Sequence, residues 1–289
     1  MTVWNLGSIN ADFVYSVPHL PEPGETLSST GRQVFLGGKG ANMSVAIARA
    51  GGNVGHIGAV GADGLWAVER LKSYGVDTSA VAQTETETAQ AIIAVDPSGE
   101  NLIVLHPGAN HAIPESCVNQ ALTRAKAGDW FVTQNETSMQ KEGASLARAS
   151  GLKVAYAAAP FDAKAVQTLL PMLDLMILNA VEMAQLNAAI GKGPGELGVS
   201  ILIVTKGADG ADLYKDGQGP IHVPAVPVKP VDTTGAGDTF TGYVLAGLDA
   251  GMAIEDAMAL ASKAGALMVT RHGTADVIPT IQEVEAFRP

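Results

Sequence analysis

Short runs rich in β-branched residues alternate with stretches of helical periodicity along almost the whole chain. This alternation is typical of a doubly wound α/β fold, in which helices flank a mostly parallel sheet. The near-continuous apolar run at residues 200–205 suits a parallel strand that is buried on both faces. Strands are expected at residues 3–7, 56–60, 130–134, 153–157, 175–178 and 200–205. Helices are expected at residues 41–50, 64–74, 114–127, 138–149, 163–170, 181–190, 237–250, 254–270 and 281–287.

Two parts of the chain break this alternation, because strand-like runs follow one another there without a helix. They comprise residues 13–17 with 27–35, and residues 91–95 with 102–106 around the turn Asp96-Pro97-Ser98-Gly99. We expect them to form a small antiparallel sheet that serves as a lid or as an oligomer surface. The alternative is a pair of ordinary edge hairpins.

The charge balance excludes several classes of partner. The chain has 18 basic and 29 acidic side chains, a formal net charge of −11, which argues against nucleic acid and against anionic membrane surfaces. Its apolar runs fall far short of the ~20 residues that a spanning helix needs. The first 12 residues lack the basic start of a secretory signal, and the single cysteine, Cys117, cannot form an internal disulfide. We therefore expect a cytoplasmic protein with a structural cysteine.

The segment Asp232-Thr-Thr-Gly-Ala-Gly-Asp238 follows an extended run at residues 222–231 and opens a long apolar helix. A helix start of this kind gathers free backbone N–H groups around one point and so makes an anion site. Gly235 and Gly237 let the backbone come close to a phosphate. Asp238 is either a first-turn carboxylate that complements the helix dipole, or a general base that takes a proton from an attacking hydroxyl. The spacing alone leaves both interpretations open.

Polar residues stand at the ends of several other expected strands. Gly37 to Asn42 form a second glycine-rich turn into a helix, without the spacing of a Walker A loop. Asn10 and Asp12 share one side of the chain and can hold vicinal hydroxyls, or they can form an Asx turn. Asn179 with Glu182, and Asn135 with Glu136, follow two more strands, at the edge where open α/β sheets bind ligands.

Two longer signatures carry a resemblance to a known family. They are GGKGANMSVAIARAGG at residues 37–52 and DTTGAGDTFTGYVL at residues 232–245. With both, the chain resembles the ribokinase-like (PfkB-type) carbohydrate kinases from its first strand to its last helix. The segments GSINAD and GGKGAN are most similar to the ribokinase branch of that family. The resemblance implies a single domain over residues 1–289, a three-layer αβα fold, and a lid contributed by about residues 11–36 and 90–108.

The resemblance also implies a role for each matching residue. Asp238 would be the catalytic base that acts on a primary hydroxyl, and Gly235, Ala236 and Gly237 would form the anion hole for the γ-phosphoryl group. Glu182 would hold Mg²⁺ through water. The implied sugar contacts are Asn10, Asp12, Gly38, Lys39, Asn42, Glu136 and Asp238. The implied ATP contacts are Asn179, Thr205, Lys206, Gly207, Gly210, Gly237 and Ser262.

Two departures from the family pattern stand out. A ribokinase binds a monovalent cation beside the anion hole, and the matching positions here are Asp232, Thr234 and the carbonyls around Met268, Arg271 and Gly273. Val277 stands where that branch of the family has a serine, which puts activation by K⁺ in doubt. The segment 183–199 is also short and loop-like, as if much of one helix were missing.

The expected function is therefore an ATP-dependent sugar kinase that uses Mg²⁺, with the conversion of D-ribose to ribose 5-phosphate as the leading case. The alternatives are a kinase of a nucleoside or of another sugar such as a ketohexose, and a non-catalytic protein that binds sugar and nucleotide. A homodimer formed through the lid is expected, because its alternating apolar strands would otherwise leave an exposed edge.

Overall fold

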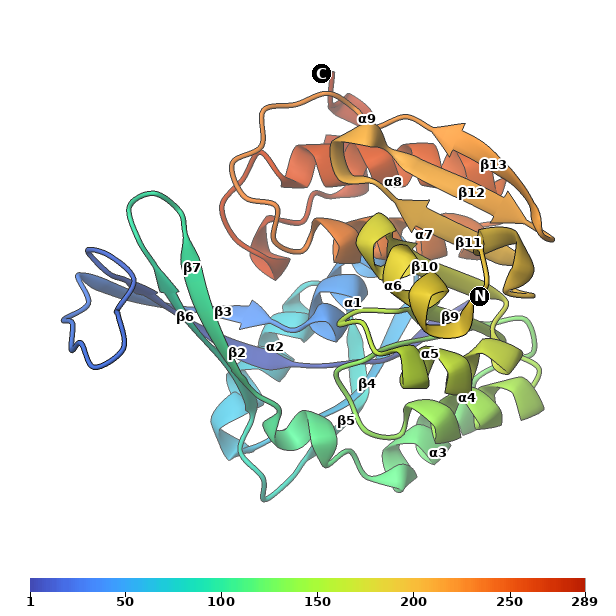
Figure 1. The fold of residues 1–289 in the computed structure, drawn as a ribbon. Coiled ribbons are helices and arrows are strands. Elements are labelled where there is room, and N and C mark those ends of the chain that lie inside the picture. Colours follow the sequence, from blue (N-terminus) through green and yellow to red (C-terminus); the bar gives the residue numbers. More distant parts are fainter. Residues whose placement is uncertain (289) are drawn as a thin grey trace.

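The computed structural model describes residues 1–288 and contains two sheets. The larger one has nine strands in the order β13-β12-β11-β10-β9-β8-β1-β4-β5 (Figure 1). From β5 to β11 neighbouring strands run parallel, whereas β12 and β13 are antiparallel additions at one edge. The strands are β1 Val3–Leu6, β4 Val54–Val60, β5 Asp77–Gln83, β8 Trp130–Gln134, β9 Lys153–Ala157, β10 Leu175–Asn179, β11 Ile201–Thr205, β12 Ala211–Lys215 and β13 Gln218–Val223.

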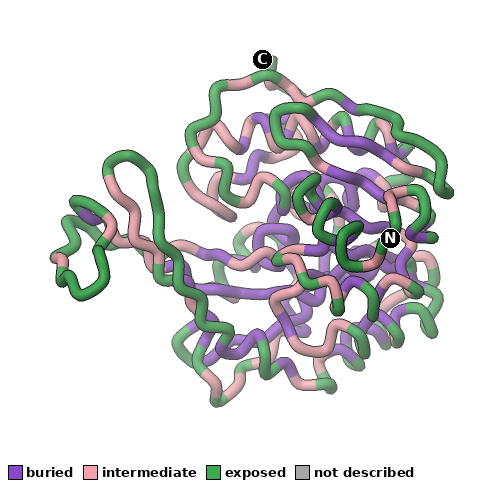
Figure 2. Tube along the Cα trace, in the orientation of Figure 1, coloured by how far each residue is buried: buried purple, intermediate pink, exposed green. Residues whose placement is uncertain are grey.

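Helices cover both faces of this sheet, which confirms the three-layer expectation. Alternate strand residues enter different cores: Val3 packs with the helices of one face, and its neighbour Trp4 with those of the other. Figure 2 shows the sheet as a buried band between more exposed layers. One face carries α1 Lys39–Arg49, α2 Leu65–Ser73, α7 Ala236–Asp249, α8 Ile254–Met268 and α9 Ile281–Ala286. The other carries α3 Glu115–Arg124, α4 Gln140–Ala149, α5 Ala163–Leu169 and α6 Ala180–Ile190.

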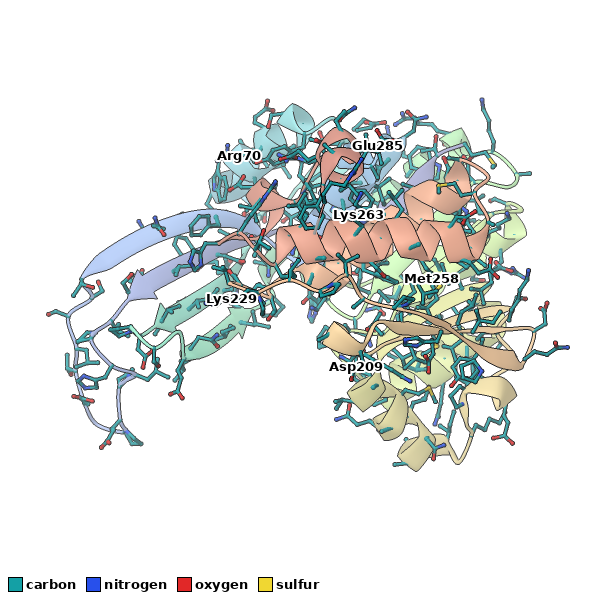
Figure 3. The ribbon with its side chains drawn as sticks, turned by 90° about the horizontal axis from the view of Figure 1, so that it is seen from above. Arg70, Asp209, Lys229, Met258, Lys263 and Glu285 are labelled. Atoms are coloured by element: carbon teal, nitrogen blue, oxygen red, sulfur yellow. The ribbon has the colours of Figure 1, made fainter. Side chains whose placement is uncertain are left out.

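The smaller sheet, called the lid below, has the order β3-β2-β6-β7 and projects away from the body (Figures 1 and 3). Its strands are β2 Asn10–Ser16, β3 Gly31–Gly37, β6 Ala89–Val95 and β7 Asn101–His106. The pairs β2–β3 and β6–β7 are antiparallel as expected, but β2 and β6 pair in parallel, so the sheet is mixed. Both strands continue parallel strands of the main sheet, β1 and β5, and therefore leave the body in the same direction.

The other expected strands and helices are present with small shifts of their ends, and three strands, β5, β12 and β13, were not expected. Strand β13 is exposed along five of its six residues, and β12 and β5 carry polar residues, so neither a long apolar run nor a clear alternation marks them. The extended run expected at 222–231 is a strand only to Val223, and the strand expected from residue 27 begins at Gly31. Between Ile190 and Ile201 the chain forms only the 3₁₀ turn Pro194–Glu196, as the loop-like sequence predicted.

A close backbone contact joins the end of β1 to the start of α1. A Cβ added to Gly40 would lie 2.4 Å from backbone atoms of Gly7, and one added to Gly7 would lie 2.5 Å from the Cα of Gly40. Only glycine at both positions permits this approach, because an added methyl group would force the strand and the helix apart. The contact determines where the first turn of α1 stands above the sheet.

We expect Gly40→Ala to lower the free energy of unfolding by about 1–3 kcal/mol, the usual cost of overpacking. The matched control is Gly265→Ala in α8, where the nearest atom to the added Cβ is 3.9 Å away. The control should be neutral or stabilising by up to about 1 kcal/mol, since alanine favours helix. Urea unfolding of both variants measures the difference. Equal effects of the two substitutions would contradict the tight contact.

Candidate active site

The candidate residues gather at the carboxyl edge of the main sheet. Asn179 ends β10 and Thr205 ends β11, while Glu136 follows β8 by two residues. The ammonium group of Lys39 is close enough to the carboxylates of Asp238, Glu136 and Glu182 for them to raise its pKa, Asp238 most strongly, although burial opposes this. One lysine therefore faces three acidic side chains that the chain contributes from widely separated segments.

The start of α7 has the backbone geometry that the expected anion cradle requires. Gly235 precedes the helix with φ of 74°, and a Cβ there would meet the Cε of Met268 at 2.9 Å. A Cβ on Gly237, in contrast, would meet no atom within 4 Å, so open space lies beside this turn. No acceptor bonds the amides of Gly237 and Asp238 within residues 1–288, as is usual for the first turn of a helix. These N–H groups are free to hold an anion in that space.

Asp238 lies directly beside this cradle and is buried, with 7% of its surface exposed. Its Oδ2 accepts a hydrogen bond of 2.9 Å from Asn42 Nδ2. Burial raises the pKa of the Asp238 carboxyl, while Lys39 and the bond from Asn42 act in the opposite direction. Asp238 does lie in the first turn of α7, as the helix-dipole alternative requires, and its burial and raised pKa also suit it to accept a proton.

The second glycine-rich turn brings α1 to the same place. Gly38 has φ of 94°, and a Cβ there would meet the carbonyl O of Ser8 at 2.8 Å, so the turn requires glycine. The amide of Lys39 donates to Glu136 Oε2 over 3.1 Å, and the hydroxyl of Ser8 donates to the same oxygen. Burial raises the pKa of Glu136, and Lys39 partly offsets this.

Asn10 and Asp12 are both buried, but they open β2 of the lid rather than ending β1 as expected, because β1 stops at Leu6. The carboxylate of Asp12 lies across Gly37, where an added Cβ would meet its Oδ2 at 1.9 Å. Asp12 Oδ1 and Asn42 Oδ1 are buried with no hydrogen-bond partner in the described chain. Burial, and secondly the charge of Glu136, raise the pKa of Asp12 to about 7. A buried acceptor without a donor is what a hydroxyl-bearing ligand would satisfy.

Asn179 and Glu182 form a capping box at the start of α6. Glu182 N donates to Asn179 Oδ1 over 2.9 Å, and Asn179 N donates to Glu182 Oε2 over 2.7 Å. Burial raises the pKa of Glu182. Residues 1–288 contain no cluster of three or more histidine, cysteine or acidic side chains that could enclose a metal ion. Any Mg²⁺ here would therefore be held mainly by phosphate and water, which is its usual mode of binding.

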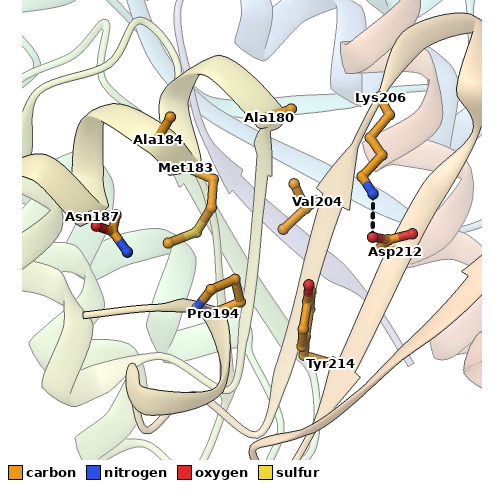
Figure 4. Close-up of a pocket in the computed structure, with 9 residues that line it drawn as sticks. All are labelled: Ala180, Met183, Ala184, Asn187, Pro194, Val204, Lys206, Asp212 and Tyr214. Atoms are coloured by element: carbon orange, nitrogen blue, oxygen red, sulfur yellow. Dashed lines mark hydrogen bonds and ion pairs between the residues drawn. The ribbon is translucent and has the colours of Figure 1, made fainter. Parts of the chain in front are cut away.

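The predicted nucleotide loop is a tight turn after β11. Lys206 N donates to Gly210 O over 2.7 Å, and Gly207 and Gly210 have φ of 59° and 88°. Lys206 Nζ pairs with Asp212 at one side of a cavity of about 420 Å³ (Figure 4). Ser262 lies half-buried on α8, separate from this cavity. The cavity lies between α6, the segment that follows it, and β11 and β12, and its lining is Ala180, Met183, Ala184, Asn187, Pro194, Val204, Lys206, Asp212 and Tyr214.

The residues of the expected K⁺ site also come together. Asp232 accepts hydrogen bonds from Thr234 N over 2.9 Å and from Gly273 N over 3.2 Å. The carbonyl of Met268 accepts from Arg271 N over 2.9 Å. Val277 packs against Gly273, and its carbonyl accepts a bond of 3.2 Å from the Arg271 guanidinium group. The guanidinium group of Arg271 is therefore bonded to the carbonyl of Val277, the residue that replaces the family's serine.

Several residues of the site were missed by the sequence analysis. Ser8 and Asn110 bond to the substrate-binding candidates, and a buried hydrogen-bonded network lies beneath the start of α1. In that network His56 is fully buried, which lowers its pKa to about 4, so it is neutral. Of these, Ser8 lies in the segment GSINAD and Ser44 in the signature at residues 37–52, whereas Asn110 lies in none of the motifs. The network consists of Asn5, Ser44, His56 and Gln134, joined to Gly7 and Gly40.

A buried carboxyl group with a raised pKa beside unbonded backbone amides suits the transfer of a phosphoryl group to an alcohol. The comparisons with known proteins agree. The profile of the pfkB family carbohydrate kinases matches residues 2–281. The chain belongs to this family and is a phosphotransferase with an alcohol as acceptor.

Individual relatives are similar over their full length. The ribokinase of Haemophilus influenzae is 34% identical, with 99% of this chain and 98% of the relative covered. The structure of a Cryptococcus neoformans ribokinase in complex with ADP has 33% identity and a TM-score of 0.81, with 98% of each chain covered. The Arabidopsis thaliana ribokinase complexed with ribose and ATP has 27% identity and a TM-score of 0.85, with 99% and 98% covered. The first alignment spans 301 positions against the 289 residues of this chain, so it contains gaps in this chain.

We expect Asp12→Asn to stabilise the protein at pH 8 and to leave its stability unchanged at pH 4. Between pH 3.8 and about 7 the folded state retains a proton on Asp12 that the unfolded state has lost, so the free energy of unfolding falls as pH rises. The shift sets an upper limit of ~4 kcal/mol for the gain. Denaturant unfolding across this pH range measures it.

The control is Asp209→Asn at an exposed position, labelled in Figure 3, which should change stability little at either pH. A stability difference between Asp12→Asn and the original chain that stays constant with pH would show that Asp12 titrates normally.

Proposed function

We propose that this protein is an ATP-dependent sugar kinase whose leading substrate is D-ribose, converted to ribose 5-phosphate. The observation that carries the proposal is the position of Asp238, a buried carboxylate beside the open amides of α7 and in the field of Lys39. The relatives named ribokinase, one of them complexed with ribose and ATP, support ribose as the acceptor. We expect this activity in the cytoplasm.

In the proposed mechanism Asp238 accepts the proton of the primary hydroxyl as its oxygen attacks the γ-phosphoryl group. The amides at Gly235 and Gly237 stabilise the charge on the transferring group, the amide of Ala236 joins them once its bond to Thr233 O opens, and Lys39 adds a positive charge nearby. Asn42 holds the Asp238 carboxylate in place through the bond to Oδ2. Positioning and charge stabilisation carry most of the work in phosphoryl transfer, so this set is sufficient.

The sugar would lie between the start of α1 and the root of the lid. Asp12 and Asn42 offer buried acceptors without partners, and Asn10 and Glu136 stand beside them. The backbone at Gly38 and the side chain of Lys39 complete the proposed contacts. Closure of the lid over the sugar would exclude water, which otherwise competes as acceptor and hydrolyses ATP.

ATP would extend from the cradle along the carboxyl edge toward Thr205, Gly207 and Gly210. Asn179 and Glu182 stand between these two places and would orient the waters of Mg²⁺ rather than bind the ion directly. Bound with ATP, Mg²⁺ neutralises phosphate charge. Lys206 and Ser262 complete the proposed nucleotide contacts, Lys206 only after its bond to Asp212 opens.

Groups of the protein itself already occupy part of the expected site for a monovalent cation. Gly273 and Asp232 already bond to each other, and Arg271 occupies the carbonyl of Val277. The carbonyl of Met268 accepts a bond from Arg271 N, so the carbonyls of Thr234, Arg271 and Gly273 would have to hold most of the ion. We therefore expect activation by K⁺ to be small.

Two other functions compete with a ribose kinase. A nucleoside contains the same ribosyl group, so Asn10 and Asp12 would suit a nucleoside kinase, and a ketohexose kinase uses the same chemistry. A non-catalytic protein that binds sugar and nucleotide would keep the pocket without needing the base. The buried, hydrogen-bonded Asp238 favours catalysis.

We expect ATP-dependent phosphorylation of D-ribose, and a loss of about 10²–10⁴-fold in kcat in Asp238→Asn, because a general base contributes that much. Sugar affinity of this variant, measured by calorimetry, should stay nearly unchanged. The assay uses pentoses, ketohexoses and nucleosides, each with and without K⁺.

The matched control is Asp209→Asn, an exposed position in the nucleotide loop, which should retain most of kcat. Binding of sugar and ATP without product in the original chain would favour the non-catalytic alternative. Turnover of Asp238→Asn at the original rate would remove Asp238 as the base.

We propose that two copies of the chain pair through their lids. All six residues of β7, the edge strand of the lid, are exposed, and Val104 and Leu105 expose 55% and 58% of their surfaces. Because successive residues of a strand point to opposite faces, apolar side chains are exposed on both faces of this edge. Such an edge is prone to pair with another chain.

The expected result is a dimer at micromolar concentration in sedimentation equilibrium. The double substitution Ile103→Lys and Leu105→Lys should shift the equilibrium to monomer, since it places two charges on one face of β7. Ser98→Lys, in the turn of the same hairpin, is the control and should remain dimeric. A monomeric original chain would contradict the pairing.

A further inference from the structure

Asn110 lies in the 3₁₀ turn Gly108–His111, directly after β7, and exposes only 2% of its surface. Gly108 has φ of 41°, and a Cβ there would meet the carbonyl O of Glu87 at 2.5 Å, so the turn sits tightly against the start of β6. The amide of Ala109 donates to the same carbonyl over 2.8 Å. Asn110 is thereby held at the root of the lid.

The hydrogen bonds of Asn110 assign the orientation of two side-chain amides. The backbone N–H of Ile9 donates to Asn110 over 3.0 Å, so the accepting atom must be the oxygen, Oδ1. The other branch of Asn110 is therefore the NH₂ group, which donates to Asn10 Oδ1 over 2.8 Å. The other polar group of the Asn10 side chain is its NH₂ group, and residues 1–288 provide no acceptor for it.

We propose that Asn110 is a positioning residue that makes Asn10 a hydrogen-bond donor to the sugar. Asp12, two residues along the same face of β2, offers an acceptor without a partner. The root of the lid then presents one donor and one acceptor side by side, and adjacent hydroxyls of a sugar satisfy both. This inference rests on the proposed sugar kinase and assigns the part of the site that selects a vicinal diol.

Asn110 also has a structural contact that a test must separate from this role. Its carbonyl accepts a bond of 2.9 Å from Ser138 N, in the loop that carries Glu136. A substitution that moved the loop would disturb the site without involving Asn10. The side chain must therefore be changed while the backbone of the turn is preserved.

The test is Asn110→Asp. The new carboxylate still accepts from Ile9 N–H, but its second oxygen cannot donate, so the Asn10 amide turns over and presents its oxygen to the sugar. We expect KM for ribose to rise at least tenfold, with kcat and KM for ATP changed less than threefold. Asn119→Asp, the same change at an exposed position of α3, should leave all three constants unchanged.

A double-mutant cycle with Asn10→Ala separates positioning from a purely structural role. In the Asn10→Ala background, Asn110→Asp should cause no further rise in KM for ribose. With one of the two analogues 2-deoxyribose and 3-deoxyribose, namely the one that lacks the hydroxyl bound by Asn10, Asn110→Asp should not change KM. An undiminished effect in that background, or with both analogues, would overturn the proposal, as would an unchanged KM in the single variant.

A second measurement covers the case in which Asn110→Asp fails to fold. In ¹⁵N spectra of the folded protein, the side-chain amide protons of Asn110 should exchange slowly with solvent, and faster in Asn10→Ala. Equal exchange in both would overturn the proposal. If the original chain phosphorylates no sugar or nucleoside, the proposed function fails, which the activity of the unsubstituted chain shows before any variant is made.

Discussion

The contact between Gly7 and Gly40 determines the position of the first turn of α1, and the active site is built around that turn. Helix α1 packs just as closely against α7 on its opposite side, where a Cβ on Gly242 of α7 would lie 2.5 Å from Ala46 Cβ. Helix α1 is therefore held between β1 and α7 by glycine on both sides. The bond from Asn42 to Asp238 crosses the second of these contacts, so the packing of the two helices also aligns the proposed base.

Buried polar groups support this turn from below. Asn5 donates to Gly40 O and to Ser44, and neutral His56 joins Ser44 to Gly7 O. Networks of this kind are costly unless their members have partners, and here every side-chain polar atom of the network has one in the described chain except Gln134 Oε1. Above the turn the situation is reversed, because Asp12 Oδ1 and Asn42 Oδ1 lack partners and three carboxyl groups have raised pKa values. The protein thus carries destabilising groups where a polar ligand can satisfy them.

The sequence predicted the main strands and helices well because burial on both faces leaves continuous apolar runs, as in β8 and β10. It missed the two edge strands, β5 and β13, and β12 beside β13, because polar residues interrupt their apolar runs. It predicted an antiparallel lid because hairpin signals are local, whereas the parallel pairing of β2 with β6 depends on where β1 and β5 end in space. Asn110 was missed for a similar reason, since its partners Ile9 and Asn10 are about a hundred residues away in the chain.

By itself the sequence determined the α/β class, the two glycine-rich helix starts and the residues able to do the chemistry, because periodicity, glycine spacing and side-chain type are local properties. Tertiary structure decided which of these residues meet. Lys39 faces acidic side chains from three other segments, and the amide of Asn10 takes its direction from a bond that begins at a distant turn. Burial and hydrogen-bond direction depend on all the neighbours of a group, and these are known only once the chain is folded.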